Sequence, residues 1–574
     1  MMLIAPGQCP PEQIRVKRSD AVYNAHQYLT KVPVSAIQPF IEAYTEPGGT
    51  VLDPFAGSGM TGVAAAMVGR RAVLSDVSVL GRHVGTNYVN LVDPGQFRQA
   101  AGRALARASA RLGRVYQHAC TRCVNSAELS RRVWSVVVRC GSCAADVNFY
   151  RSLERAGSRK SHMVCTSCDG PISSRNQRVG EEPVLDTVSC GCRRNLFDQA
   201  ISEPLGAPPL VSAPDVAITP DRQMYQASAL ARNKLESTAA FFSTRNLAAL
   251  TCLHEAILQE PDDALRNKLL FAFTAILTRA SKRYQWSRQR PLNAANQNYY
   301  VAPVFYEWNV FDLYQRKVEA AVRSDCMIST SAAWHPLGAE LQVEYLLASA
   351  DALPLADESI DYVFTDPPFG SNIFYSDMNL FQEAWLGAFT NHSLEVVVDR
   401  SGDPSKRRTA ERYEQLLVDA LRECHRVLKP NGHFSLVFSN SSGKIWALLQ
   451  RAIRSADFTL EPDGVSLLDK GQRSVKGLNS GFEDVVTTDL ILTTRKRHPT
   501  EHVQEMSPGE WESLLADAVL AGEHLTPSHV YLNLVRECLR RHWDLTPVSF
   551  GRVVAALRER GYQADAASGR FLPT

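Results

Sequence analysis

The sequence predicts an α/β protein with an open, mostly parallel sheet, interrupted by a cysteine-rich insertion and a helical insertion. Residues 50–76 have the pattern of a strand, a glycine-bearing turn, a helix and a second strand. Another apolar strand, residues 360–365, follows about 300 residues later. Between them, eight of the 13 cysteines fall in close pairs over residues 120–192. We therefore expect a long insertion to split the sheet-forming chain.

Length and composition indicate a folded protein of several domains. A chain of 574 residues is too long for one ordinary core, and its 45% hydrophobic and 21% charged residues are the balance of a folded protein. The formal net charge of +2 does not indicate a nucleic-acid partner, so any DNA-binding surface must be local. The sequence has no apolar stretch of membrane-spanning length and no signal-peptide pattern. We expect a cytoplasmic protein without a membrane segment.

We divide the chain into five expected segments. The sheet domain takes residues 1–115 and 336–498, on either side of the insertions. Residues 116–200 are expected to form the cysteine-rich insertion, and residues 201–335 the helical insertion. Residues 499–574 are expected to form a small helical C-terminal domain of winged-helix-like pattern.

The turn over residues 53–59, Asp-Pro-Phe-Ala-Gly-Ser-Gly, follows the first strand directly. Its glycines allow the backbone to approach a ligand closely. Asp76 ends the next strand, where a carboxylate can accept hydrogen bonds from ribose hydroxyls. An ordinary tight turn, with Asp76 as a helix N-cap, also fits these residues. The pattern is not Gly-x-Gly-x-x-Gly, which argues against a dinucleotide.

This turn resembles the cofactor loop of the amino-methyltransferases of DNA, which use S-adenosylmethionine. In that family the preceding segment carries a His-x-x-x-x-Lys-Pro-like element beside the methionine end of the cofactor, and residues 26–33 look like it. In related enzymes an acidic residue after another strand contacts the cofactor's adenine amino group. The resemblance implies a Rossmann-like sheet and these cofactor-binding residues: Lys31, Pro33, Asp53, Pro54, Phe55, Gly57, Gly59, Asp76 and Asp351.

The second half-site is the tetrad Asp366-Pro367-Pro368-Phe369 at the end of the strand over residues 360–365. An exocyclic amino nitrogen is a poor nucleophile because its lone pair is delocalised into the base. The Asp366 carboxylate and the Pro367 carbonyl can accept its two hydrogens and aim the lone pair at a methyl donor. Pro367 and Pro368 stiffen the backbone, and Phe369 offers a face on which an extruded base can stack. These four residues are the predicted catalytic group.

The tetrad resembles the Asp-Pro-Pro-Tyr signature of the same family, with Phe369 in place of tyrosine. In that family an aspartate at the first position is usual for adenine enzymes and a serine for cytosine enzymes. Methylation of cytosine at C5 would need a cysteine in a Pro-Cys context, which the sequence lacks. The resemblance therefore implies N6 methylation of adenine in double-stranded DNA, in a restriction-modification or phage-defence system with partner subunits.

The clustered cysteines predict metal binding rather than disulfides in a reducing compartment. Eight thiolates suffice for two tetrahedral zinc sites, and both a sequential and a nested combination of the pairs fit the spacing. An iron-sulfur cluster is the minor alternative. The predicted ligands are Cys120, Cys123, Cys140, Cys143, Cys165, Cys168, Cys190 and Cys192.

Two groups of cations suit contacts with nucleic-acid phosphates, although a solvated or structural surface fits both as well. In residues 279–290 the cations Lys282, Arg283, Arg288 and Arg290 alternate with Tyr284 and Trp286. The cysteine-rich insertion carries the second group: Arg131, Arg132, Arg139, Arg151, Arg155, Arg159 and Lys160.

Two other functions remain open. Guanine-N2 methyltransferases of transfer RNA use a similar loop and signature, but they usually carry an RNA-binding N-terminal domain, and only about 50 residues precede the loop here. A non-catalytic partner subunit or zinc-scaffolded DNA-binding module is the second alternative. The intact carboxylates Asp53, Asp76 and Asp366 argue against it.

Overall fold

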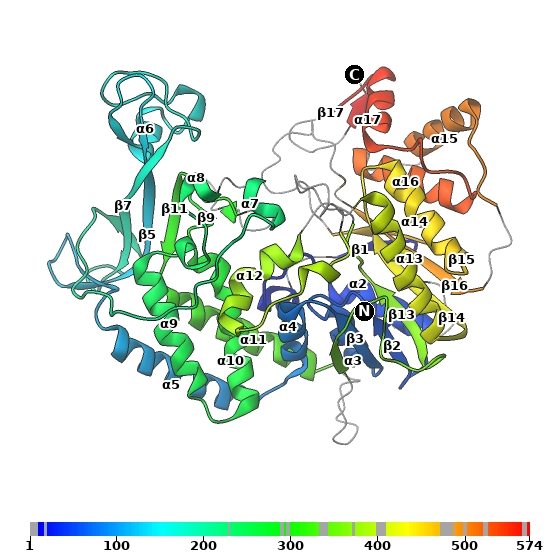
Figure 1. Ribbon diagram of the computed structural model, residues 1–574, viewed down its shortest axis with the longest axis horizontal. Helices are drawn as coiled ribbons and strands as arrows, with labels where there is room; N and C mark the ends of the chain where they lie inside the picture. The colour runs from blue at the N-terminus through cyan, green and yellow to red at the C-terminus, as the bar shows by residue number, and fades with distance from the viewer. Residues whose placement is uncertain are drawn as a thin grey trace.

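The computed structural model describes residues 10–16, 20–227, 230–287, 292–293, 299–331, 343–369, 374–397, 409–470, 486, 488–497, 502–520, 526–564 and 571–573. Figure 1 shows the cysteine-rich insertion at the upper left, helices below it, and the central sheet and C-terminal helices on the right. Among the described residues no helix is both long and apolar enough to cross a membrane.

An eight-stranded sheet forms the centre of the protein. β16 is antiparallel to both of its neighbours, and every other neighbouring pair in this sheet is parallel. This arrangement confirms the expected Rossmann-like α/β sheet. In spatial order the strands are β12 (Val343–Leu347), β3 (Arg71–Asp76), β2 (Thr50–Asp53), β13 (Ile360–Thr365), β14 (Leu428–Phe438), β16 (Asp489–Lys496), β15 (Phe458–Asp469) and β1 (Gln13–Arg15).

Both faces of the sheet are buried. Successive side chains of a strand point to opposite faces, and here they belong to two different hydrophobic clusters. Val51 belongs to one hydrophobic cluster and Leu52 to the other, and Tyr362 and Val363 divide in the same way. This explains why these strands are almost continuously apolar. The helices of this domain are α1 (Ala21–Ala25), α2 (Val34–Tyr44), α3 (Met60–Met67), α4 (Val79–Val89), α12 (Tyr375–Leu386), α13 (Ala410–Val427) and α14 (Gly443–Ser455), with the 3-10 turn His392–Leu394.

The cysteine-rich insertion is built on a second sheet whose longest strands, β5 and β7, pair antiparallel. β11 comes from the helical insertion and pairs with β5, so the two insertions share this sheet. The elements are β4 (Gln117–Ala119), β5 (Ser126–Arg139), β6 (Asp146–Asn148), α6 (Phe149–Arg155), the 3-10 turn Lys160–His162, β7 (Arg178–Ser189), β8 (Phe197–Gln199), β9 (Tyr284–Gln285), β10 (Leu292–Asn293) and β11 (Val304–Trp308).

Helices pack beneath this second sheet in Figure 1 and join it to the central one. α10 contacts α4 and α12 of the sheet domain as well as α9 and α11. The helices of this region are α5 (Pro94–Leu112), α7 (Gln223–Ala227), α8 (Leu230–Asn233), α9 (Thr244–Leu258), α10 (Asp263–Ala280) and α11 (Val310–Ser329), with the 3-10 turn Ala239–Phe241.

The C-terminal unit consists of three helices followed by an antiparallel pair of strands. Its side chains continue the hydrophobic cluster on one face of the central sheet, because Leu534 and Leu448 lie in the same cluster. The winged-helix-like name for this unit stays a prediction. Its elements are α15 (Pro508–Leu520), α16 (Pro527–Arg540), α17 (Phe550–Glu559), β17 (Tyr562–Ala564) and β18 (Phe571–Pro573).

Candidate active site

The two predicted half-sites lie side by side because β2 and β13 are neighbours in the sheet. Val51 pairs with Tyr362 in parallel register, across more than half of the chain. The carboxyl ends of parallel strands meet at one edge, where α/β proteins bind their ligands. There the Thr365 hydroxyl donates a hydrogen bond of 2.7 Å to the Asp53 carboxylate. The insertions therefore separate the half-sites in sequence but not in space.

The Asp53 carboxylate holds the glycine turn in shape. It also accepts hydrogen bonds from the Thr61 hydroxyl at 2.6 Å and from the Phe55 amide at 3.2 Å. Gly59 has a φ of +77°, and a Cβ there would lie 2.7 Å from the Cα of Gly85 in α4. Only glycine permits both this left-handed backbone and the close approach of α4 to the turn.

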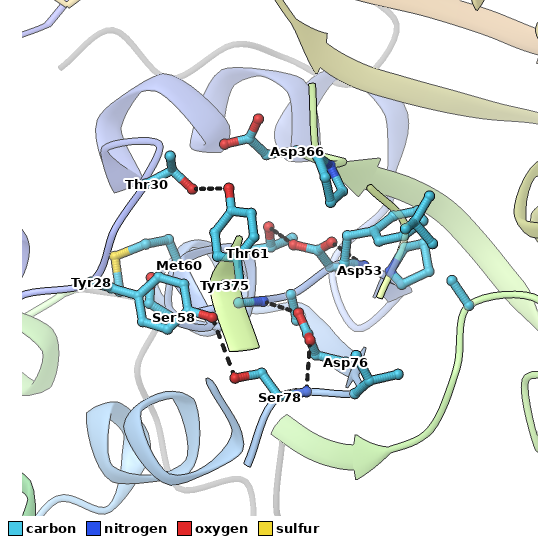
Figure 2. A pocket seen from close by; sticks show the side chains of 18 of the residues that line it. Tyr28, Thr30, Asp53, Ser58, Met60, Thr61, Asp76, Ser78, Asp366 and Tyr375 are labelled. Carbon is cyan, nitrogen blue, oxygen red and sulfur yellow. Dashed lines mark hydrogen bonds between the residues drawn. The ribbon is translucent and has the colours of Figure 1, made fainter. Parts of the chain in front are cut away.

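Asp76 fastens the turn from the tip of β3. Its carboxylate accepts hydrogen bonds from the Gly57 amide at 2.8 Å and from the Ser78 amide at 2.9 Å (Figure 2). Burial raises the pKa of Asp76. Each carboxylate oxygen has a further lone pair, so Asp76 can still accept hydrogen bonds from a ligand's hydroxyls.

These residues line one pocket that encloses about 880 Å³ of empty space, including open solvent at its mouth. In Figure 2 Asp366 lies toward one end of the view and Asp76 toward the other, with Tyr375 between them. Of the predicted residues, the lining includes Lys31, Asp53, Pro54, Phe55, Gly57, Asp76, Asp366 and Pro368.

Five predicted residues are not part of this lining: Pro33, Gly59, Asp351, Pro367 and Phe369. Asp351 is exposed, and its neighbours Ser349 and Ala350 line the pocket instead. Pro33 is the N-cap of α2. Their predicted roles stay predictions.

Lys31 lines the pocket, but its ammonium group is used within the protein. It donates hydrogen bonds to the carbonyl of His26 at 2.7 Å and to the carbonyl of Tyr23. Burial lowers the pKa of Lys31 to about 7. The ammonium group of Lys31 therefore holds the chain before the glycine turn, and its hydrogen bonds go to protein carbonyls.

The tetrad has a partly buried acid, Asp366, and its backbone is held by a hydrogen bond. Burial raises the pKa of Asp366 to about 7; nearby Lys470 opposes this, and the Asp489 and Asp53 carboxylates add to it. The Pro368 carbonyl accepts a hydrogen bond from the Tyr413 hydroxyl at 2.6 Å. Within the described part of the chain, no group donates a hydrogen bond to the Asp366 carboxylate or to the Pro367 carbonyl. The Asp366 carboxylate, which lines the pocket, is thus open to a ligand, whereas Pro367 is buried outside the lining and its role as an acceptor stays a prediction.

Tyr28, Thr30, Tyr375 and Glu395 are among the lining residues that were not predicted. The Thr30 and Tyr375 hydroxyls are 3.0 Å apart and hydrogen-bonded. The buried Glu395 carboxylate accepts hydrogen bonds from the Tyr375 amide at 2.5 Å and from the Ser376 hydroxyl at 2.6 Å. Burial raises the pKa of Glu395 to about 7. Tyr28 and Thr30 lie inside the predicted 26–33 element, whereas no motif marks the other two.

The cation-rich segment of residues 279–290 contributes to the interior of the protein. Arg283 is 2% exposed, and its guanidinium lies 4.7 Å from the centre of the Phe381 ring. Lys282 forms a 2.8 Å ion pair with Glu181. The hypothesis that this segment grips a nucleic-acid strand is therefore wrong for Arg283, and for Lys282 it stays a prediction. Arg288 and Arg290 lie outside the described residues.

The cations of the cysteine-rich insertion differ in burial and in whether they form ion pairs. Arg132 is buried and forms an ion pair of 2.6 Å with Asp186, so it is structural. Arg139 and Arg155 form more exposed ion pairs with Asp146 and Asp169. The side chains that remain exposed and outside these ion pairs are Arg151, Arg159 and Lys160.

The eight cysteines form two four-sulfur clusters in a nested arrangement. One cluster contains Cys120, Cys123, Cys190 and Cys192, and the other contains Cys140, Cys143, Cys165 and Cys168. The arrangement follows from the antiparallel pairing of β5 with β7, which places the start of one strand beside the end of the other. The 14 residues of β5 span roughly 45 Å at about 3.4 Å per residue, so its two flanking pairs are too far apart to share an ion.

The sulfur geometry fits zinc. A tetrahedral ion with zinc-sulfur bonds of about 2.3 Å separates its sulfurs by about 3.8 Å. The Cys120–Cys192 and Cys123–Cys190 sulfurs are 3.8 and 3.5 Å apart. In the other cluster the separations are 3.7 Å for Cys140–Cys168 and 3.8 Å for Cys143–Cys165. A disulfide would require about 2.05 Å.

Comparisons with known proteins agree on a methylase segment. A family model described as DNA methylase matches residues 8–82. YubD of Escherichia coli (strain K12), a protein assigned as a methylase, is 57% identical over 50 residues, which are 9% of this chain and 22% of YubD. The chain thus spans less than a quarter of that relative.

Solved structures align with larger shares of the chain, but at low identity. One is assigned as a DNA modification methylase of Thermus thermophilus, with 16% identity over 28% of this chain and 53% of that chain, at a TM-score of 0.15. Another is the 16S rRNA (adenine(1408)-N(1))-methyltransferase of Catenulisporales acidiphilia, with 13% identity over 32% of this chain and 74% of that chain, at a TM-score of 0.17. Residues 8–82, which hold the glycine turn and Asp76, match the DNA methylase family.

Proposed function

We propose that the protein is an S-adenosylmethionine-dependent DNA methyltransferase that transfers a methyl group to N6 of adenine. The observation that carries the proposal is the single pocket into which both the glycine turn and Asp366 open. A cofactor held by the turn and an amine held by Asp366 would meet there without further rearrangement of the sheet. The match of residues 8–82 to a DNA methylase family supports DNA as the substrate.

The charge of the pocket suits this cofactor. The carboxylates of four residues line it: Asp53, Asp76, Asp366 and Glu395. Among the described lining residues the one cation is Lys31, whose ammonium group donates its hydrogen bonds to protein carbonyls. S-adenosylmethionine carries a sulfonium and an ammonium against one carboxylate, so it is a net cation. Its loss of a methyl group removes the sulfonium charge. A negative pocket therefore favours the methyl donor over the demethylated product.

The tetrad supplies the acceptors that an adenine amino group needs. Hydrogen bonds from the amine to Asp366 and to the Pro367 carbonyl would draw its nitrogen toward tetrahedral geometry. Because the tetrad backbone is held in place, this geometry exists before substrate binds, which lowers the cost of alignment. An adenine in duplex DNA would first have to leave the base stack to reach the pocket.

The remaining assignments belong to the same proposal. Each four-sulfur cluster holds one zinc ion, which stabilises the fold of the segment around it. Double-stranded DNA is the substrate, and restriction or phage-defence subunits are the expected partners. Incubation of duplex DNA with the protein and S-adenosylmethionine labelled in its methyl group tests the central assignment. A parallel incubation with transfer RNA in place of DNA tests the alternative, because a label found only in transfer RNA would favour guanine-N2 methylation.

Methyl transfer should depend on pH through Asp366. Only the ionised carboxylate accepts hydrogen bonds fully, and burial raises its pKa to about 7. The single-turnover rate should therefore rise with pH and level off above an apparent pKa at or below about 7, since a bound cation nearby favours the ionised form. Asp366→Asn should remove this inflection. If the variant and the unmodified protein have the same inflection, another group is responsible.

A further inference from the structure

The C-terminal unit and the tetrad touch the same short loop. Residues 439–442 follow β14 and precede α14. On one side this loop contacts Phe369 of the tetrad, and on the other side it contacts Phe550 at the start of α17. A unit that is remote in sequence thus lies one loop away from the predicted catalytic residues.

Asn440 makes the contact with the tetrad. Its side-chain amide donates a hydrogen bond of 3.1 Å to the Phe369 carbonyl. Its side-chain oxygen accepts one from the Ser442 amide at 2.9 Å, and its backbone carbonyl accepts one from the Trp446 indole at 2.9 Å. The first bond ties the loop to the tetrad, and the other two hold Asn440 within the loop and against α14.

The C-terminal unit holds the same loop from the opposite side. The Phe550 amide donates a hydrogen bond of 2.9 Å to the Ser441 carbonyl. Gly443 opens α14 beneath this contact, and a Cβ there would overlap the carbonyl oxygens of Leu545 and Val548. The docking is close enough that even one added methyl group would push the unit away.

Contacts between aromatic rings involve the tetrad, α14 and the C-terminal unit as well. The Phe369 ring packs edge-on against Phe438 at 5.0 Å, and Phe438 packs edge-on against Trp446 at the same distance. In the C-terminal unit, Tyr531 packs edge-on against Phe550 at 5.5 Å. Trp446 and Tyr531 are fully buried in one continuous cluster. Displacement of the unit would therefore loosen the packing behind the tetrad.

We propose that the C-terminal unit positions the catalytic tetrad through Asn440 and its loop. The inference rests on the proposed function, because it concerns where Asp366 and Pro367 stand relative to the target amine. Asn440 is a positioning residue and touches neither the cofactor nor the base in this account. A shift of about 1 Å in such a group can lower a rate about a hundredfold. The cofactor turn is held by its own hydrogen bonds to Asp53 and Asp76, so it should not respond.

The variant Gly443→Ala tests this directly, because it displaces the unit without changing a polar group. We expect about a hundredfold loss of kcat with an unchanged Kd for S-adenosylmethionine. Gly102→Ala is the matched control, since Gly102 lies exposed within α5 and a Cβ there meets nothing within 4 Å. It should leave kcat and the Kd unchanged. An unchanged kcat in Gly443→Ala would overturn the proposal, and so would an equal loss of cofactor affinity.

Hydrogen exchange supplies a readout that does not depend on activity. In Gly443→Ala, amides of the peptide that contains Phe369 and of residues 439–442 should exchange faster, while those around Gly57 should not. Asn440→Leu removes the bond to Phe369 and leaves the Gly443 contact intact, so it should reproduce both the loss of kcat and the faster exchange at Phe369. If the unmodified protein transfers no methyl group, the proposed function fails, and exchange alone decides the positioning. Unchanged exchange at Phe369 in both variants would refute it.

Discussion

Replacement of Asp366 by alanine should lower the rate of methyl transfer about a thousandfold, because the amine loses its charged acceptor at the moment its nitrogen attacks. The affinity for S-adenosylmethionine should stay nearly the same, since Asp53 and Asp76 hold the turn on the cofactor side. A single-turnover assay together with a cofactor titration separates the two effects.

Two further variants make this result specific. Asp366→Asn keeps the shape and one oxygen acceptor, so we expect a smaller loss than in Asp366→Ala. Asp463→Ala removes an exposed carboxylate in β15 and should change neither parameter. If Asp366→Ala retains transfer within about tenfold of the unmodified protein, Asp366 is not the acceptor.

The second large effect that we expect is the loss of one zinc ion when a cysteine of one cluster is replaced. Elemental analysis should find two zinc ions per chain, and Cys165→Ser should leave one. The clusters lie at opposite ends of the β5–β7 ribbon, so loss of one ion should not empty the other site. Residues 140–168 should then become sensitive to proteases, because small metal modules fold only with their ion.

Cys326→Ser is the matched control for the metal count. Cys326 is exposed and belongs to neither cluster, so its variant should keep two zinc ions and the same resistance to proteases. Fewer than one zinc ion per unmodified chain would contradict the assignment, as would an iron-sulfur absorbance band.

The sequence predicted what depends on local pattern. The glycine turn, the strand that ends at Asp76 and the strand before Asp366 are short segments whose residue types carry their own structural signal. The central sheet could be expected because both half-sites end strands at a binding edge. Membership of β11 in the second sheet could not, since Phe305 and its partner Trp134 are far apart in the chain.

The site residues that were predicted belong to local sequence patterns, and those that were missed depend on contacts between distant segments. Tyr375 and Glu395 enter the pocket because α12 begins there, which depends on packing of α12 against α4 and α10. Arg283 looked like a phosphate contact because aromatic residues lie near it in the sequence, yet the ring that it contacts, Phe381, comes from α12, about 100 residues later. The nested cysteine clusters required the antiparallel pairing of β5 with β7, which the spacing alone left open.

Nucleoside analysis of methylated DNA tests the central claim most directly. Unmethylated duplex DNA is incubated with the protein and S-adenosylmethionine, digested to nucleosides and examined by mass spectrometry, with Asp366→Ala as the parallel sample. We predict N6-methyladenine with the unmodified protein and almost none with the variant. Methylcytosine in place of methyladenine, or no methylated nucleoside from a protein that binds S-adenosylmethionine, would contradict the account.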